Sequence, residues 1–170
     1  MGVDKALLDV GQGALALHAV RLVAEVCETA ALVGDPEKYG SLGFPVIPDN
    51  VPGFGPLGGI ETALSRSAAE WNLIVACDMP LISVEIFERL FSSAPGFDCA
   101  VPRHANGLVE PLCAVYARGC HAAVAEALAA GVRRVTDGLR SLAVRYVQTG
   151  GEASFANLNT PEDVRKYRNG

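Results

Sequence analysis

"NLIVACDMP", residues 72–80, combines a short run of apolar side chains with a carboxylate that follows almost at once. The run from Leu73 to Ala76 is typical of a buried strand, and Asp78 stands where that strand would end. A carboxylate there is well placed to hold Mg²⁺, which takes one or two carboxylates and fills its remaining positions with water and phosphate oxygens. The alternative interpretation is that Asp78 only caps the turn before the next helix.

The segments around this strand alternate between strand and helix patterns. Short apolar runs bounded by Gly, Pro or Asp predict strands, and apolar residues at helical spacing predict helices. The predicted strands cover 30–33, 44–47, 73–76, 99–101, 112–116 and 143–147; the predicted helices cover 14–25, 60–67, 83–91, 119–129, a short piece at 135–139 and a last helix from 160. This order indicates an α/β sandwich with a mainly parallel sheet. No linker divides the chain, so residues 1–170 are expected to form one domain.

Composition and charge limit the classes of function. The chain has 170 residues, of which 50% are hydrophobic and 19% charged, enough for one packed domain. A net charge of −5 argues against nucleic acid as a partner, although small anions can still bind locally to a few lysines, backbone N–H groups or a metal. With no signal-peptide pattern, no membrane-length apolar run and five cysteines outside any C-x-x-C pair, we expect a soluble, cytoplasmic protein with no membrane contact.

A glycine- and proline-rich stretch, "PDNVPGFGPLGGIETAL" at residues 48–64, leads into a predicted helix. Glycines let the backbone approach a ligand closely, and the N-terminus of the helix offers free N–H groups to an anion or a base edge. An ordinary surface loop is the competing interpretation.

Three further places carry polar side chains that could meet a ligand. Glu110 precedes the predicted strand in "EPLCAVY", and Asn157 and Asn159 precede a helix start in "FANLNTPED". Arg133 and Arg134 follow Gly131, where they either cap a helix in solvent or face an anionic substrate. The asparagines equally fit plain turn chemistry. The three histidines lack partners at the spacing of a zinc site or a catalytic triad, so solvated or structural roles are expected for His18, His104 and His121.

Five stretches taken together resemble one known family. These are "MGVDKALL" (1–8), "IPDNVPGFGPLGGI" (47–60), "ACDMPL" (76–81), "EPLCAVY" (110–116) and "NLNTPED" (157–163). In order and spacing they resemble the molybdenum cofactor guanylyltransferases, which are nucleotidyltransferases with a Rossmann-like α/β fold. The resemblance implies transfer of GMP from GTP to the phosphate of molybdopterin carrying molybdenum, with Mg²⁺ as cofactor and release of pyrophosphate.

The resemblance also implies roles for individual residues. Lys5 would contact the GTP phosphates and Asp78 would bind Mg²⁺, which makes these two the catalytic residues. The nucleotide pocket would comprise Lys5, Asp49, Gly55, Gly58 and Gly59, and the pterin side Asn157, Asn159, Arg133 and Arg134. The implied partners are GTP and molybdopterin, with molybdoenzymes or their chaperones receiving the product.

The beginning of the chain departs from the family pattern. That pattern reads L-A-G-G-x-S-x-R-M-G-x-D-K after a first strand, and only its end matches Met1, Gly2, Asp4 and Lys5. Because a sheet of this kind has a strand before its first ligand loop, we expect the first strand to be missing and this chain by itself to be a poor or inactive enzyme. Cytidylyl transfer to molybdopterin, transfer to another phosphorylated acceptor, and a degenerate non-catalytic nucleotide-binding module are the alternatives.

Overall fold

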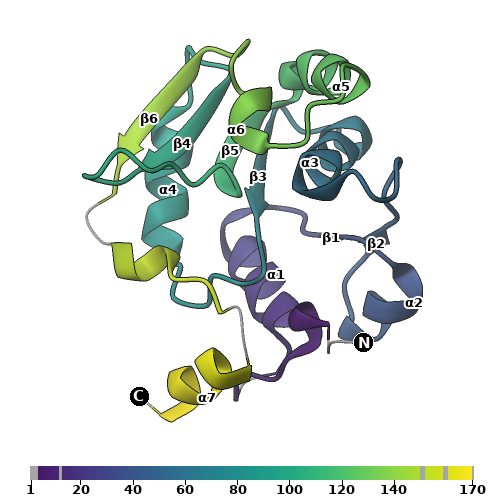
Figure 1. Cartoon of the computed structure of the whole chain (residues 1–170), viewed down its shortest axis with the longest axis vertical. Helices are drawn as coiled ribbons and strands as arrows, with labels where there is room; N and C mark the ends of the chain where they lie inside the picture. The colour runs from purple at the N-terminus through teal and green to yellow at the C-terminus, as the bar shows by residue number, and fades with distance from the viewer. Residues whose placement is uncertain (1–3, 12, 150–151, 159–160, 170) are drawn as a thin grey trace.

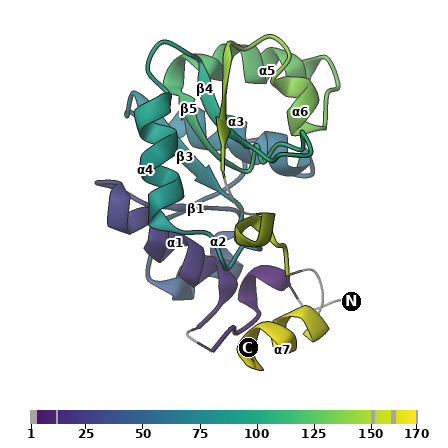
Figure 2. The ribbon, with the colours of Figure 1, turned by 90° about the vertical axis from the view of Figure 1, so that its left-hand side faces the viewer.

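A central sheet lies between two layers of helices, as Figures 1 and 2 show for this computed structural model. The structure describes residues 4–11, 13–149, 152–158 and 161–169. On one face of the sheet lie α1 (Leu15–Val26) and α4 (Val84–Ser93); on the other lie α3 (Gly55–Arg66), α5 (His121–Ala129) and α6 (Val135–Gly138). The predicted three-layer α/β sandwich is therefore confirmed.

The described strands form two sheets. A parallel pair contains β1 (Leu32–Val33) and β2 (Val46–Ile47), and a larger sheet has the order β3 (Trp71–Val75), β5 (Cys113–Ala117), β4 (Cys99–Arg103) and β6 (Val144–Gln148). In the larger sheet β5 runs antiparallel to both β3 and β4, and β6 runs parallel to β4. Thus β3, β4 and β6 point in one direction and β5 alone is reversed, so two pairings of this sheet are antiparallel and one is parallel.

The sheet is covered on both faces because its central strands are apolar on both faces. Successive side chains of a strand point to opposite sides. In β4, Cys99 and Val101 pack toward α3 and α5, whereas Ala100 packs toward α4. In β5, Tyr116 joins the first cluster and Val115 the second. All five residues are fully buried, so each face depends on its helix layer to exclude water.

Short elements complete the chain. They are α2 (Pro36–Tyr39), α7 (Pro161–Asn169) and the 3₁₀ turns η1 (Lys5–Leu7), η2 (Gly40–Leu42), η3 (Arg118–Cys120) and η4 (Glu152–Phe155). A third apolar cluster joins the start of the chain to its end: Val10 and Leu15 pack with Leu158 and with Val164 of α7. The last helix therefore docks beside the N-terminal segment, as Figure 1 shows.

The structure corrects the predicted start of α3. The sequence predicts a loop up to residue 59, whereas the helix begins at Gly55. Proline at the first positions of a helix costs no backbone hydrogen bond, so Pro56 can stand in the first turn. Consequently the glycines expected in a loop, among them Gly58 and Gly59, belong to the N-terminal turns of this helix.

The strands β1 and β3 belong to separate sheets and do not pair with each other. Within the described residues each has only one hydrogen-bonded partner, β2 for β1 and β5 for β3. All five side chains of β3 remain half-buried, whereas β4 and β5 are almost fully buried. Met1 and Gly2, which match the end of the family's glycine loop, lie outside the described residues, so the expectation of a missing first strand stays a prediction. None of the helices in the described part of the chain is long and apolar enough to cross a membrane.

Candidate active site

Asp78 lies at the end of β3, in the turn that leads to α4. Its residue is half-buried, and its main-chain carbonyl accepts a hydrogen bond from the amide of Leu158 at 2.8 Å. Two residues before it, the amide of Ala76 donates a backbone hydrogen bond to the carbonyl of Leu112 at 2.7 Å. The turn is therefore fixed from two sides, and its carboxylate is carried on rigid backbone at the carboxyl edge of the sheet, where ligands bind in open α/β sheets.

The N-terminal turn that carries Lys5 lies beside the turn of Asp78, because Leu8, next to η1, and Cys77, next to Asp78, pack against the same apolar cluster. Burial raises the pKa of Cys77 to about 11, with further increases from the charges of Asp78 and Asp4, while the charge of Lys5 lowers it. Lys5 is exposed in η1, where Asp4 caps the turn by accepting from Ala6 at 3.1 Å.

Asp4 ties this N-terminal turn to the segment that follows β1. Its carboxylate accepts a hydrogen bond from the Tyr39 hydroxyl at 2.9 Å and lies 3.8 Å from the Lys38 ammonium. Burial and the neighbouring Asp4 raise the pKa of Tyr39 to about 12. The start of the chain, α2 and the turn after β3 thus meet at one place.

A cavity of about 390 Å³ lies at the N-terminus of α3. Its lining consists of Val33, Asp49, Val51, Gly53, Phe54, Gly55, Pro56 and Gly59. The predicted nucleotide residues Asp49, Gly55 and Gly59 are therefore brought together, and Asp49 is exposed at this cavity. Its volume falls in the range of small-molecule sites.

Glycine is present at each of these positions for a different structural reason. Gly55 has a φ of 63°, a left-handed conformation that side chains disfavour. At Gly58 an added Cβ would come within 2.9 Å of the Phe54 Cβ, so no larger residue fits. An added Cβ at Gly59 would meet nothing within 4 Å. Gly55 and Gly58 thus shape the loop, and Gly59 leaves open space beside it.

The loop before α3 is held to the helix by Asn50. Its backbone amide donates to the Thr62 hydroxyl at 3.0 Å, its side chain donates to Ser65 at 2.8 Å, and it accepts from Arg66 at 3.0 Å. These bonds fix the neighbouring Asp49 backbone against the helix. A fixed loop keeps the cavity formed before a ligand binds, which lowers the entropy lost on binding.

Of the two arginines predicted for the pterin side, Arg133 lies near this cavity. The guanidinium carbon of Arg133 stands 4.0 Å from the centroid of the Phe54 ring, a cation–π contact, and Phe54 lines the cavity. Arg134 is exposed at the N-cap of α6. The structure therefore brings Arg133 to the predicted nucleotide pocket; its predicted role toward the pterin stays a prediction.

The predicted asparagines lie toward the other end of the chain. Asn157 is exposed and directly precedes Leu158, whose amide binds the carbonyl of Asp78. Asn157 is thus one residue from the backbone bond that fastens this segment to the turn of Asp78. Asn159 lies outside the described residues.

The side chains near Asp78 suit a Mg²⁺ ion that is bound partly by the protein and partly by the substrate. Within the described part of the chain, no three His, Cys, Asp or Glu side chains gather into a set that could enclose a metal ion. Mg²⁺ commonly keeps several waters and is bound through one or two carboxylates plus substrate phosphates. A single half-buried carboxylate at Asp78 fits that mode of binding.

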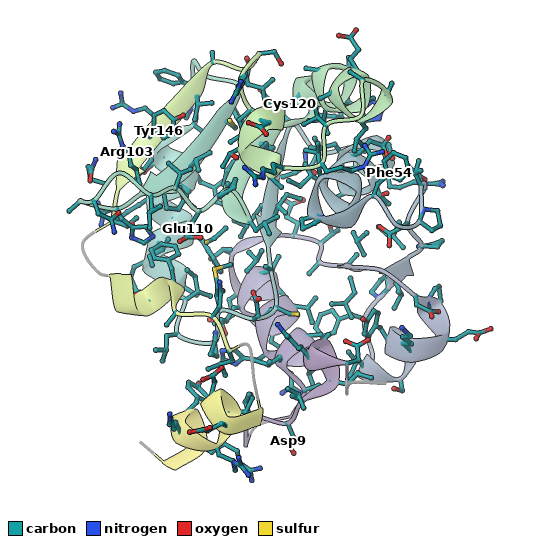
Figure 3. All side chains as sticks on the ribbon, viewed as in Figure 1. Asp9, Phe54, Arg103, Glu110, Cys120 and Tyr146 are labelled. Carbon is teal, nitrogen blue, oxygen red and sulfur yellow. The ribbon has the colours of Figure 1, made fainter. Side chains whose placement is uncertain are left out.

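The sequence predicts a solvated or structural role for His104 and places Glu110 among the polar residues that could meet a ligand, without a specific role. His104 is only 4% exposed, and its Nε2 lies 2.9 Å from Glu110 Oε1. Its ring meets Phe155 of η4 edge to face at a centroid distance of 5.0 Å. Figure 3 shows Glu110 near η4, far across the molecule from Phe54. The six-residue spacing of the pair across a hairpin loop is not a recognised motif, so sequence alone could not single it out.

Comparisons with known proteins show the family and the fold of the chain. Residues 1–146 match the MobA-like NTP transferase domain. A "probable molybdenum cofactor guanylyltransferase" of Pelotomaculum thermopropionicum is 40% identical over 99% of this chain and 85% of its own length. The crystal structure of molybdopterin-guanine dinucleotide biosynthesis protein A from Archaeoglobus fulgidus superposes with a TM-score of 0.82 at 25% identity, covering 99% of this chain and 90% of that one.

A more distant structure shares the fold alone. The 2-C-methyl-D-erythritol 4-phosphate cytidylyltransferase of Thermus thermophilus gives a TM-score of 0.75 at 17% identity, with 99% of this chain and 98% of that chain covered. The fold and the site define a nucleotidyltransferase of the Rossmann-like type. Within that class, the chain belongs to the molybdenum cofactor guanylyltransferase family.

Proposed function

We propose that this protein transfers GMP from GTP to the phosphate of molybdopterin carrying molybdenum, and that Mg²⁺ binds at Asp78 during the reaction. The observation that carries the proposal is that Asp78 lies in the turn after β3, at the carboxyl edge of the sheet, in a chain of this family. Its turn lies beside the N-terminal turn that carries Lys5 on one side and is bonded to the segment of Asn157 on the other. A reaction that joins two phosphate-bearing substrates needs such a cationic centre between them.

The two substrates would approach Asp78 from different sides. The cavity at Asp49 and Phe54 takes the guanosine, since a carboxylate accepts from guanine N1–H and its 2-amino group. The segment of Asn157 faces the acceptor. Figure 1 supports this division, because β1 and β2 lie on one side of β3 and the remaining strands lie on the other.

The chemistry is an in-line displacement at the α-phosphorus. An oxygen of the acceptor phosphate forms a bond to that phosphorus, the bond to the bridging oxygen breaks, and pyrophosphate leaves with the electron pair. Lys5 stabilises negative charge on the phosphates, and Asp78 positions the cation by its carboxylate. When bound, Mg²⁺ neutralises charge on the phosphate oxygens. No side chain needs to form a covalent bond.

The proposal is tested by replacing Asp78 with Asn. The substitution keeps the shape of the side chain and removes its charge, so pyrophosphate release with GTP, Mg²⁺ and molybdopterin should fall about a hundredfold or more. Asp98→Asn is the matched control, because Asp98 is also half-buried, directly precedes β4 at the opposite edge of the sheet from Asp78, and on replacement by Asn keeps an amide oxygen that can accept from Ala143. Full turnover in Asp78→Asn, or equal loss in both variants, would contradict the assignment.

A further inference from the structure

The His104–Glu110 pair joins the end of β4 to the start of β5. Besides its 2.9 Å contact with His104, Glu110 is held by its backbone: its amide donates to Pro102 at 3.1 Å, and its carbonyl accepts from Cys113 at 3.1 Å. The Glu110 side chain is 26% exposed, whereas that of His104 is 4% exposed. A buried imidazole therefore fixes one oxygen of a carboxylate whose remaining surface is accessible.

Strand register brings this carboxylate to the edge of the sheet that carries Asp78. Val75 pairs with Cys113 across the antiparallel β3 and β5. Asp78 follows Val75 by three residues and Glu110 precedes Cys113 by three residues, so both leave the sheet at the same edge. The Phe155 ring against His104 places the segment before Asn157 there as well. Glu110 and Phe54, which lines the α3 cavity, lie on opposite sides of β3, as Figure 3 shows.

Two buried polar atoms at this edge lack partners among the described residues: His104 Nδ1 and Thr149 Oγ1. They are neighbours in register, because Arg103 pairs with Gln148 in the parallel strands β4 and β6 and the next residues are His104 and Thr149. Buried polar groups in folded proteins are normally hydrogen-bonded. Because neither atom has a hydrogen-bond partner among the described residues, we expect a polar group of a ligand or a water to bind here.

Glu110 presents acceptors at this edge. A carboxylate can only accept, so His104 Nε2 donates to Glu110 Oε1, and Glu110 Oε2 is a further acceptor. A partly exposed carboxylate suits a flat ring that carries two adjacent N–H donors. A pterin carries such a pair of donors, N3–H and the 2-amino group.

We propose that Glu110, positioned by His104, binds the N3–H and 2-amino donors of the pterin ring of the acceptor substrate. Guanine carries the same pair of donors, but its predicted pocket is the cavity at Phe54. The inference rests on the proposed function for the identity of the acceptor. It names Glu110 as a specificity-determining residue and His104 as a positioning residue.

The test compares two stable, fluorescent probes, 6-hydroxymethylpterin and 6-hydroxymethyllumazine, which differ in having an amino group or a carbonyl at position 2. Fluorescence titration gives the affinity of the protein for each probe, and a parallel titration gives the affinity for GTP with Mg²⁺. The wild type should prefer the pterin by about tenfold or more, since a mismatched carbonyl leaves the carboxylate unpaired. Glu110→Gln should bring the ratio close to one with GTP affinity unchanged.

His104 is tested by two substitutions. His104→Leu removes the donor to Glu110 and should reduce the pterin preference, whereas His104→Gln keeps an N–H donor and should restore part of it. Glu61→Gln is the matched control, because Glu61 and His121 form a pair with the same 2.9 Å contact elsewhere, on α3 and α5. That variant should leave the ratio unchanged.

Three results would overturn the inference: a wild type that binds both probes equally or not at all, an unchanged ratio in a folded Glu110→Gln, or a loss of GTP affinity as large as the loss of pterin affinity. If Glu110→Gln does not fold, the ratio in the two His104 variants decides. The probe titrations need no turnover, so a wild type that discriminates the probes but transfers no GMP to molybdopterin would refute the proposed function and leave this inference standing.

Discussion

The amide of Leu158 donates a hydrogen bond to the main-chain carbonyl of Asp78 at 2.8 Å, across eighty positions of sequence. This bond fastens the segment before α7 to the turn after β3. Because Leu158 is buried with Val10 and Leu15, the apolar cluster at the start of the chain supports the same contact. The turn of Asp78 therefore depends on both ends of the protein.

The exposed Asn157 should contribute to acceptor binding. Asn157→Ala removes a side-chain amide beside the turn of Asp78. If this amide binds the acceptor phosphate, its loss should raise the KM for molybdopterin roughly tenfold to hundredfold, because a hydrogen bond to a charged group is lost. GTP affinity should not change. Asn72→Ala is the control, since Asn72 lies in β3 toward the opposite end of the sheet. A KM equal to that of the wild type would remove Asn157 from the acceptor site.

Asp49 should decide the affinity for the base. Asp49→Ala removes the carboxylate at the α3 cavity, and binding of GTP should weaken by about tenfold while binding of pyrophosphate, which has no base, is unchanged. Calorimetric titration of both ligands provides the measurement. An equal loss for GTP and pyrophosphate would indicate a damaged fold instead.

The contact of Arg133 with Phe54 predicts an effect on the nucleotide. Arg133→Ala removes a cation–π contact at a partly exposed ring, so affinity for GTP should fall about twofold to fivefold. Arg134→Ala, at the exposed neighbouring position, should leave GTP affinity unchanged. If instead only the KM for molybdopterin rises in Arg133→Ala, the pterin-side role implied by the family resemblance is correct.

Buried thiols predict a loss of stability in alkali. Burial raises the pKa of Cys99 to about 12 and that of Cys120 to about 11. The unfolded chain loses these protons near the ordinary thiol pKa, so stability is fully present below pH 9 and is lost as pH rises toward the folded values. Each thiol removes up to about 1.4 kcal/mol per pH unit from the free energy of unfolding.

Urea unfolding from pH 7 to pH 11 measures this loss. We expect a constant free energy of unfolding up to about pH 8 and a decline above pH 9. Cys99→Ala, which removes one of the ionising groups, should decline less steeply than the wild type. Parallel slopes for the two proteins would show that the thiols do not cause the alkaline loss.

The order of helices and strands could be predicted from the sequence because the apolar residues that set the periodicity of each element are also the residues that it buries. The run before Asp78 and the strand of Tyr116 are apolar on both faces, and the structure covers both faces with helices. The start of α3 was missed because its first turn is built from Gly and Pro, which propensity assigns to loops. Pairing direction was also partly hidden, since nothing in the apolar run of β5 marks it as antiparallel.

The part of the candidate site that is formed by residues close together in the sequence could be predicted. Asp49 and the glycines of α3 meet in one cavity because they are close in sequence. The contact of Arg133 with Phe54 and the pair of His104 with Glu110 depend on tertiary packing and on a hairpin loop, which the sequence pattern does not encode locally. The strand expected before Lys5 stays a prediction.

Product formation tests the central claim most directly. The protein is incubated with Mg²⁺, molybdopterin carrying molybdenum and either GTP, CTP or ATP, and the dinucleotide is identified by mass spectrometry. We predict a guanine dinucleotide with one pyrophosphate released per product, formed from GTP alone. A cytosine dinucleotide, or no dinucleotide from a folded protein that binds GTP, would contradict the account.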